Sequence, residues 1–148
     1  ALPLLTQLLP EAGVKPDVTQ LIGLTRWDRP VTTLDLPGVQ GGWFALPDPA
    51  TTNAFRSQYE AAFGERPHPI GNLAFDGMAA IGALVKSGKS NPLSTAAISQ
   101  GAGFKGANGI FRFLPDGTNQ RALAIATIRN KKVVVIDNAP TGFSGAGF

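Results

Sequence analysis

The sequence predicts an α/β fold in which a parallel sheet with flanking helices is followed by C-terminal antiparallel strands. Two short apolar runs in the first third have the composition of buried parallel strands. Helical segments follow from residue 48 to residue 100. The last third holds short strand-like runs separated by turn residues. The parallel part supplies few strands, so we expect this chain to be part of a larger sheet.

Composition limits the classes of function. The chain has 148 residues, of which 43% are hydrophobic and 16% are charged, and this suits one folded domain. The 13 basic residues are scattered and the net charge is only +3, so nucleic acid is not an expected partner. There are no cysteines, which excludes disulfides and thiolate metal sites. No apolar run approaches 18 residues, so we expect no membrane span.

The first elements are short. Residues 2–12 form an apolar helix that Gly13 ends. Because the chain begins with Ala1 inside Leu-rich sequence, we expect it to be a piece of a longer precursor. Residues 19–24 and 41–46 predict two strands, the first of them buried and parallel, and residues 31–36 predict a helical turn.

Two longer helices come next. Asp48 followed by Pro49 is a typical helix start, and Gly64 is a suitable residue just after the helix end. Residues 70–86 form the second helix, and residues 91–100 a short third one that begins at an Asn-Pro pair. The expected apolar stripes are Phe55, Tyr59 and Phe63 on the first helix, and Leu73, Gly77, Ile81 and Leu84 on the second.

The last third of the chain is expected to form strands and turns in place of helices. Strands are expected at 110–113, 122–128 and 133–136, joined by turns into a β-meander over 108–138. The Gly- and Ser-rich tail, 139–148, is expected to be irregular.

No catalytic or metal-binding constellation is found. Residues 101–106 match GxGxxG, but a helix precedes the glycines and a strand follows them, the reverse of a dinucleotide site. His68 is the only histidine and lies in a Pro-rich loop, so we interpret it as a surface residue. We therefore expect no enzyme activity, no cofactor and no metal.

The loop Thr25–Asp28 follows the first predicted strand. Ligands of open α/β sheets bind outside the carboxyl ends of strands. The indole of Trp27 with Arg26 and Asp28 could hold a zwitterion or a sugar. Alternatively, Trp27 covers the sheet edge beside a surface Arg/Asp pair.

Asp76 stands among apolar residues in LAFDGMAAI. A buried carboxylate must be paired or hydrogen-bonded. It therefore either bonds to nearby backbone or to an arginine, or it faces a ligand.

A family resemblance is carried by motifs along nearly the whole chain. The segment 55–84 resembles the helix-loop-helix of type I periplasmic substrate-binding proteins, which include the Leu/Ile/Val-binding proteins of ABC importers. The segment from 104 onwards is similar to the closing strands of that family, and GIFRFLPDGTNQRALAI with the FSGAGF tail most resembles the penicillin-binding protein activator branch. The matching residues are Phe55, Tyr59, Phe63, Gly64, Pro67, Phe75, Asp76, Phe104, Gly106, Gly109, Phe113, Asp116 and Gly117.

The resemblance covers only the C-terminal half of a family member. It implies that 1–47 are second-lobe elements, 48–107 first-lobe helices, 108–138 the closing meander and 139–148 the tail. Ligand would bind between the two lobes. By position, the resemblance implies a ligand-binding role for the loop Thr25–Asp28 and for Phe75. With Asp76, the expected ligand-binding residues are Thr25, Arg26, Trp27, Asp28, Phe75 and Asp76.

The expected function is that of a non-catalytic periplasmic protein that binds a small polar solute such as an amino acid. Its partners would be an ABC permease and the missing N-terminal half of the same precursor. A lipid anchor on that missing half is part of this expectation. The alternative is a periplasmic lipoprotein module that activates a penicillin-binding protein in peptidoglycan synthesis.

Overall fold

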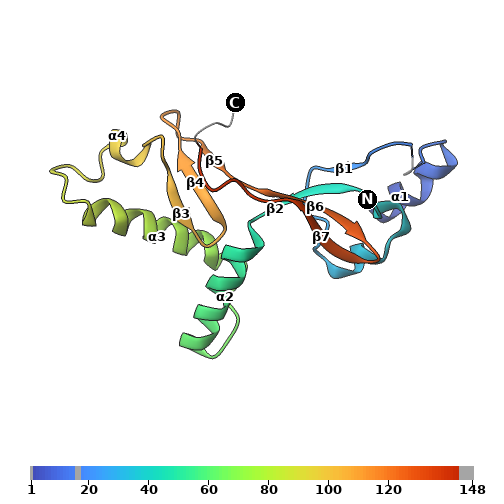
Figure 1. The fold of residues 1–148 in the computed structure, drawn as a ribbon, viewed down its shortest axis with the longest axis horizontal. Coiled ribbons are helices and arrows are strands. Elements are labelled where there is room, and N and C mark those ends of the chain that lie inside the picture. Colours follow the sequence, from blue (N-terminus) through green and yellow to red (C-terminus); the bar gives the residue numbers. More distant parts are fainter. Residues whose placement is uncertain (1, 16–17, 144–148) are drawn as a thin grey trace. The chain divides into compact units, whose positions relative to one another are not determined.

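A computed structural model describes residues 2–15 and 18–143, which divide into two compact units (Figure 1). The first unit is built from Ala1–Leu46 and Ala124–Asn138. The second unit is built from Pro47–Leu123 and Ala139–Phe148. Each unit has its own sheet, so the structure is a mixed α/β fold as predicted.

The first unit is a four-stranded sheet of order β1-β2-β6-β7 with a helix, α1, before it. Strands β1 and β2 are parallel, as predicted, and the other pairs are antiparallel. Two 3-10 turns, Val31–Asp35 and Pro37–Val39, precede β2. The other elements are α1 Leu2–Glu11, β1 Ile22–Gly23, β2 Trp43–Leu46, β6 Ala124–Arg129 and β7 Lys132–Asp137.

The first strand is shorter and more exposed than its apolar sequence indicates. Only Ile22–Gly23 pair with β2, and Ile22 is 66% exposed. The prediction of a buried strand over 19–24 is therefore wrong. The reason is position: β1 lies at the sheet edge, and none of the described residues covers the side chains of Ile22 and Leu24.

One face of this sheet carries the core of the first unit. Phe44 lies opposite Ala126 of β6, and both are buried. Trp27 and Val39, which come from outside the sheet, are also buried. The same sheet also borders an open apolar groove of about 590 Å³, lined by Ile22, Gly23, Trp43, Phe44, Ala45, Ile125, Ile136 and Asp137.

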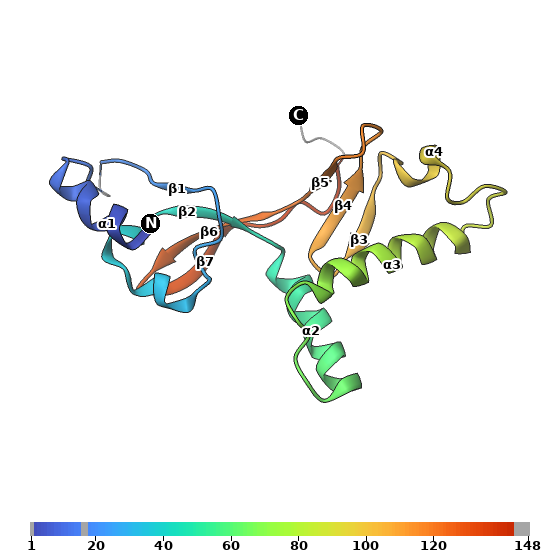
Figure 2. The same cartoon turned by 180° about the vertical axis from the view of Figure 1, so that it is seen from behind.

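The second unit packs helices on a three-stranded antiparallel sheet, with α3 beside β3 (Figure 2). Asp48 caps α2 as predicted, because its carboxylate accepts a hydrogen bond from the backbone N of Ala50 at 2.9 Å. Gly64 ends the helix with φ +73°. The elements are α2 Pro49–Phe63, α3 Gly71–Lys86, α4 Thr95–Ile98, β3 Phe104–Gly106, β4 Gly109–Phe113 and β5 Asn119–Arg121.

Helix α3 buries a different face from the predicted one. Asn72, Asp76, Ala80 and Leu84 are buried, whereas Leu73 and Ile81 of the expected stripe are exposed. Leu84 belongs to a cluster with Ala97, Phe104 and Phe111, which joins α3 to α4 and the sheet. The polar residues Asn72 and Asp76 are buried because groups of the β3–β4 turn and Arg121 bond to them, which a hydrophobic pattern does not reveal. The exposed apolar residues of α3 are Leu73, Phe75, Met78, Ile81 and Val85.

Three further features differ from the prediction. Helix α4 begins at Thr95 and not at 91, because the hydroxyl of Ser94 caps it by accepting from Ala97 N at 3.3 Å. Strands β3 and β5 were not predicted. The strands expected to form one meander over 108–138 belong to two sheets, since β4 pairs with β3 and β5 while β6 pairs with β2 and β7.

The turn between β4 and β5 is held by Asp116, as the Pro-Asp-Gly sequence indicates. The side-chain hydroxyl and the backbone N of Thr118 both donate to the Asp116 carboxylate, and these bonds lower its pKa. Residues 138–143 contain no helix or strand, and the predicted irregular tail otherwise lies outside the described residues.

The packing of Trp27 on glycine gives the first prediction. A Cβ added at Gly23 would lie 2.5 Å from Cε2 of Trp27, so we expect Gly23→Ala to lower the free energy of unfolding by about 1–3 kcal/mol in urea denaturation. The control is Gly82→Ala on α3, where no heavy atom lies within 4 Å and alanine should stabilise by up to about 1 kcal/mol. Equal stability of Gly23→Ala and the parent would contradict this packing.

Candidate functional site

The predicted site residues lie in two places, which are described separately because each belongs to one unit. Thr25–Asp28 form a loop of the first unit after β1. Phe75 and Asp76 lie on α3 of the second unit.

Trp27 is buried in the first unit. Its side chain is 6% exposed and stacks on Phe44, with ring centroids 6.2 Å apart and an interplanar angle of 29°. The indole lies against Gly23 and Gly42, where any Cβ would collide with it. Gly23 in β1 and Gly42 just before β2 therefore create the space for the indole. Trp27 has a packing role, and contact with a ligand through its remaining exposed edge stays a prediction.

Arg26 and Asp28 bind each other. Arg26 Nε donates to Asp28 Oδ1 at 2.8 Å, and Nη2 donates to Oδ2, so the pair is bidentate. The side chains are 37% and 16% exposed. In this arrangement each charge is already balanced by the other. A zwitterion could be held by both groups only after the pair has opened.

A pocket of about 430 Å³ lies at this loop. Thr25, Arg26 and Trp27 contribute to its wall. Asp28 does not line it. The other lining residues are Leu2, Pro3, Arg29, Pro30, Thr32, Thr33 and Leu36.

Sequence reasoning missed part of this pocket. Arg29, Thr32 and Thr33 are also among the lining residues. The only local signal was that they directly continue the predicted loop into the 3-10 turn that begins at Val31. A short turn reverses the chain, so residues just after a loop can return to the same pocket.

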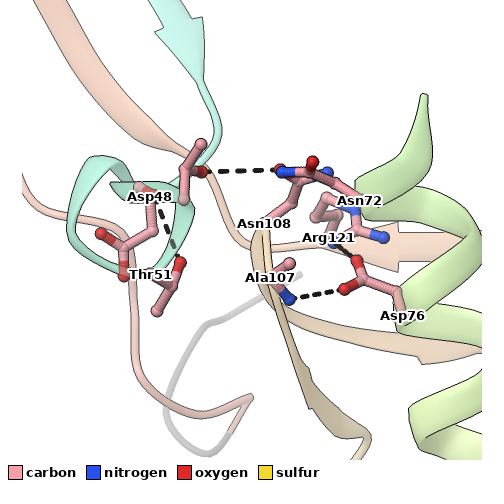
Figure 3. A network of polar contacts seen from close by, with 8 residues as sticks. Asp48, Thr51, Asn72, Asp76, Ala107, Asn108 and Arg121 are labelled. Atoms are coloured by element: carbon pink, nitrogen blue, oxygen red, sulfur yellow. Dashed lines mark hydrogen bonds and ion pairs between the residues drawn. The ribbon is translucent and has the colours of Figure 1, made fainter. Parts of the chain in front are cut away.

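Asp76 is bonded on both oxygens within the second unit (Figure 3). Its Oδ1 accepts from the backbone N of Ala107 at 2.5 Å, and its Oδ2 accepts from Nη1 of Arg121 at 2.7 Å. The residue is 1% exposed. Gly106 allows this approach, because a Cβ there would collide with the carboxylate. The bonds are those of a structural carboxylate, and a ligand-facing role for Asp76 stays a prediction.

A second polar contact lies beside Asp76 (Figure 3). The side-chain amide of Asn72 donates to Oδ1 of Asn108 at 3.0 Å, and the hydroxyl of Thr52 donates to the same oxygen at 3.5 Å. Asn108 thus connects α2, α3 and the β3–β4 turn. Together with Asp76, it fixes both helices on the hairpin.

Phe75 points away from Asp76, because consecutive helix residues are about 100° apart around the axis. Its ring centroid lies 4.8 Å from that of Phe55, and Phe55, Tyr59 and Phe63 contact one another in turn along α2. Phe75 is 47% exposed. The structure therefore places Phe75 in an aromatic row and does not bring it together with Asp76.

The remaining expectations concern metal sites, His68 and membrane spans. Among residues 2–15 and 18–143, no group of three or more His, Cys, Asp or Glu side chains could hold a metal ion. His68 is exposed, and its Nδ1 accepts from Ile70 N at 3.3 Å. Within the same ranges, no helix has the length and apolar character needed to cross a membrane.

Comparison with known proteins identifies the family. The profile described as "Periplasmic binding protein" matches residues 1–132. The chain therefore belongs to the periplasmic binding protein family, as the sequence motifs indicate. No curated protein matches the chain.

Solved structures show the same fold. The chain aligns with a branched-chain amino acid ABC transporter protein of Rhodospirillum rubrum over 84% of its own length and 39% of that chain, with 20% identity and a TM-score of 0.63. An extracellular ligand binding receptor of Desulfohalobium retbaense aligns over 90% and 24%, with 20% identity and a TM-score of 0.51. A protein of Rhodopseudomonas palustris aligns over 91% and 44%, with 17% identity and a TM-score of 0.51. The chain thus spans less than half the length of each of these structures.

The Asp76 network gives the second prediction. Asp76→Asn removes the charge that Arg121 binds and places an amide group beside a guanidinium. Because this breaks a buried ion pair, we expect the free energy of unfolding to fall by about 3 kcal/mol in urea denaturation.

The matched control is Asp35→Asn. Asp35 pairs with Lys131 at 3.4 Å, but both side chains are more than 60% exposed, so the loss should stay below about 1 kcal/mol. Equal losses for the two variants would show that burial does not strengthen the Asp76 pair.

Proposed function

We propose that the chain is part of a non-catalytic ligand-binding protein that takes up a small polar solute such as an amino acid. The observation that carries this proposal is the match of the periplasmic binding protein family to residues 1–132. The pocket at Thr25–Trp27 supports it, because a volume of about 430 Å³ is in the range of small-molecule sites.

The proposed site in the first unit consists of Thr25, Arg26 and Trp27, with Asp28 holding Arg26 in place. Phe75 and Asp76 of the second unit are proposed separately as ligand-binding residues. Exposed Phe75 offers an aromatic surface to a ligand, whereas Asp76 acts by positioning the β3–β4 turn.

Family membership also supports an extracytoplasmic, periplasmic location and an ABC permease as the membrane partner. The Rhodospirillum rubrum protein of the same fold is described as a branched-chain amino acid ABC transporter. The proposal also includes a lipid anchor that attaches the full-length protein to the membrane. No observation favours activation of a penicillin-binding protein.

A thermal-unfolding screen tests the proposal. An amino acid that binds at the pocket should, at about 100 times its Kd, stabilise the protein by roughly 2.7 kcal/mol. Thr25→Val keeps the side-chain volume but removes a hydroxyl from the pocket wall, so it should reduce this stabilisation by about 1 kcal/mol. Thr141→Val, at an exposed position of the second unit, should leave it unchanged. An absence of stabilisation by every amino acid would refute amino-acid binding, and an unaffected Thr25→Val would place the site elsewhere.

A further inference from the structure

Strand β7 lies at an edge of the first unit's sheet and exposes apolar side chains. It is the last strand in the order β1-β2-β6-β7, so within the described residues one of its two sides has no neighbouring strand (Figure 1). Its sequence, KVVVID, places four apolar residues between Lys132 and Asp137. Val134, Val135 and Ile136 are 36%, 36% and 38% exposed. An exposed apolar edge strand of this kind can pair with a strand of another chain.

The charges of β7 lie at its two ends. Lys132 is opposite Arg129 of β6, and both are exposed, so the end of β7 nearest the turn is basic. Like charges that face each other across two strands destabilise a sheet. Asp137, at the other end, is exposed as well. Neither Lys132 nor Asp137 forms an ion pair with another residue in the described part of the chain, so an oppositely charged partner would stabilise both ends.

We infer that β7 pairs in antiparallel orientation with β7 of a second copy of this chain and forms a symmetric dimer. Pairing about Val134 sets Val133 opposite Val135, and it brings the Lys132 end of each strand beside the Asp137 end of the other. Parallel pairing would instead place like charges together. A two-fold symmetric contact uses the same surface on both copies, and here it satisfies both charged ends of each strand. The dimer is weak, because an edge contact of one short strand per copy is small.

A second copy fits this edge better than other strands do. Further strands of a larger parallel sheet would join beside β1, because β1 and β2 are the parallel pair. An unrelated strand would need an acidic group, an apolar centre and a basic group in the order that a reversed β7 already supplies. The strand contributes no residue to the pocket at Thr25–Trp27, so the dimer goes beyond the proposed function and can fail independently of it.

Disulfide cross-linking tests the position of the contact, since the sequence has no cysteine. In the inferred pairing the two Val134 Cα atoms lie opposite each other, about 4.5–5.5 Å apart, which a disulfide can span. Val134→Cys in the 148-residue chain should therefore give a covalent dimer on mild oxidation. The control is Leu24→Cys, at a residue of the same unit that is 99% exposed and lies outside β7, and it should remain largely monomeric. Equal cross-linking of the two variants, or none at Val134, would overturn the inference.

Charge reversal tests the orientation, with the dimer dissociation constant measured by sedimentation. Lys132→Glu and Asp137→Lys each bring like charges together at both ends of the contact, and each should weaken the dimer by about tenfold. An equimolar mixture of the two variants should associate about as tightly as the parent, because the new carboxylate of one copy faces the new ammonium group of the other. The controls Lys89→Glu and Glu65→Lys change the charge equally at exposed positions of the second unit and should have no effect.

The mixture also distinguishes repulsion from misfolding, since variants that fail to fold would not recover association when combined. A parent chain that stays monomeric at every concentration would overturn the inference. So would a mixture that associates no better than either variant alone, or controls that weaken the dimer as much as the changes in β7 do.

Discussion

The contact between the Trp27 indole and the backbone of Gly23 and Gly42 organises the first unit. Only a residue without a Cβ allows an aromatic ring to lie so close to these strands. The buried ring fixes the path of the loop after β1, and the pocket exists because that loop is held against α1 and the 3-10 turn. Trp27, whose indole suggests stacking on a ligand, thus acts on the pocket mainly by packing under the loop.

The second unit depends on a polar contact instead. A buried carboxylate is unfavourable unless it is fully bonded, and Asp76 is bonded by a backbone N–H and by a guanidinium. Arg121 also stacks on Phe111, with Cζ 4.8 Å from the ring centroid, so the same arginine joins the polar contact to the apolar cluster. These bonds form in only one position of α3 along the hairpin. A shift of the helix would leave the buried charge of Asp76 unpaired.

Local signals could be predicted from the sequence, and non-local ones could not. The ends of α2 were correctly predicted because Asp48 and Gly64 act within one helical turn. The buried face of α3 was not, because the partner of Asp76 lies 45 residues away. The loop at Thr25 was located by its place after a strand, but Thr32 and Thr33 join the pocket only through the fold of the following turn. The family was recognised because its motifs are spread along the whole chain.

Strand β2 and its partner β6 are separated in the sequence by the whole of Pro47–Leu123. A ribosome makes the chain from the N-terminus, so the strands of the second unit, β3 to β5, emerge in immediate succession and can pair as they appear. Until β6 has been made, the edge of β2 that will pair with it stays unpaired. Such an edge can pair with another chain. The order of synthesis therefore leaves the sheet of the first unit incomplete until all three strands of the second unit have been made.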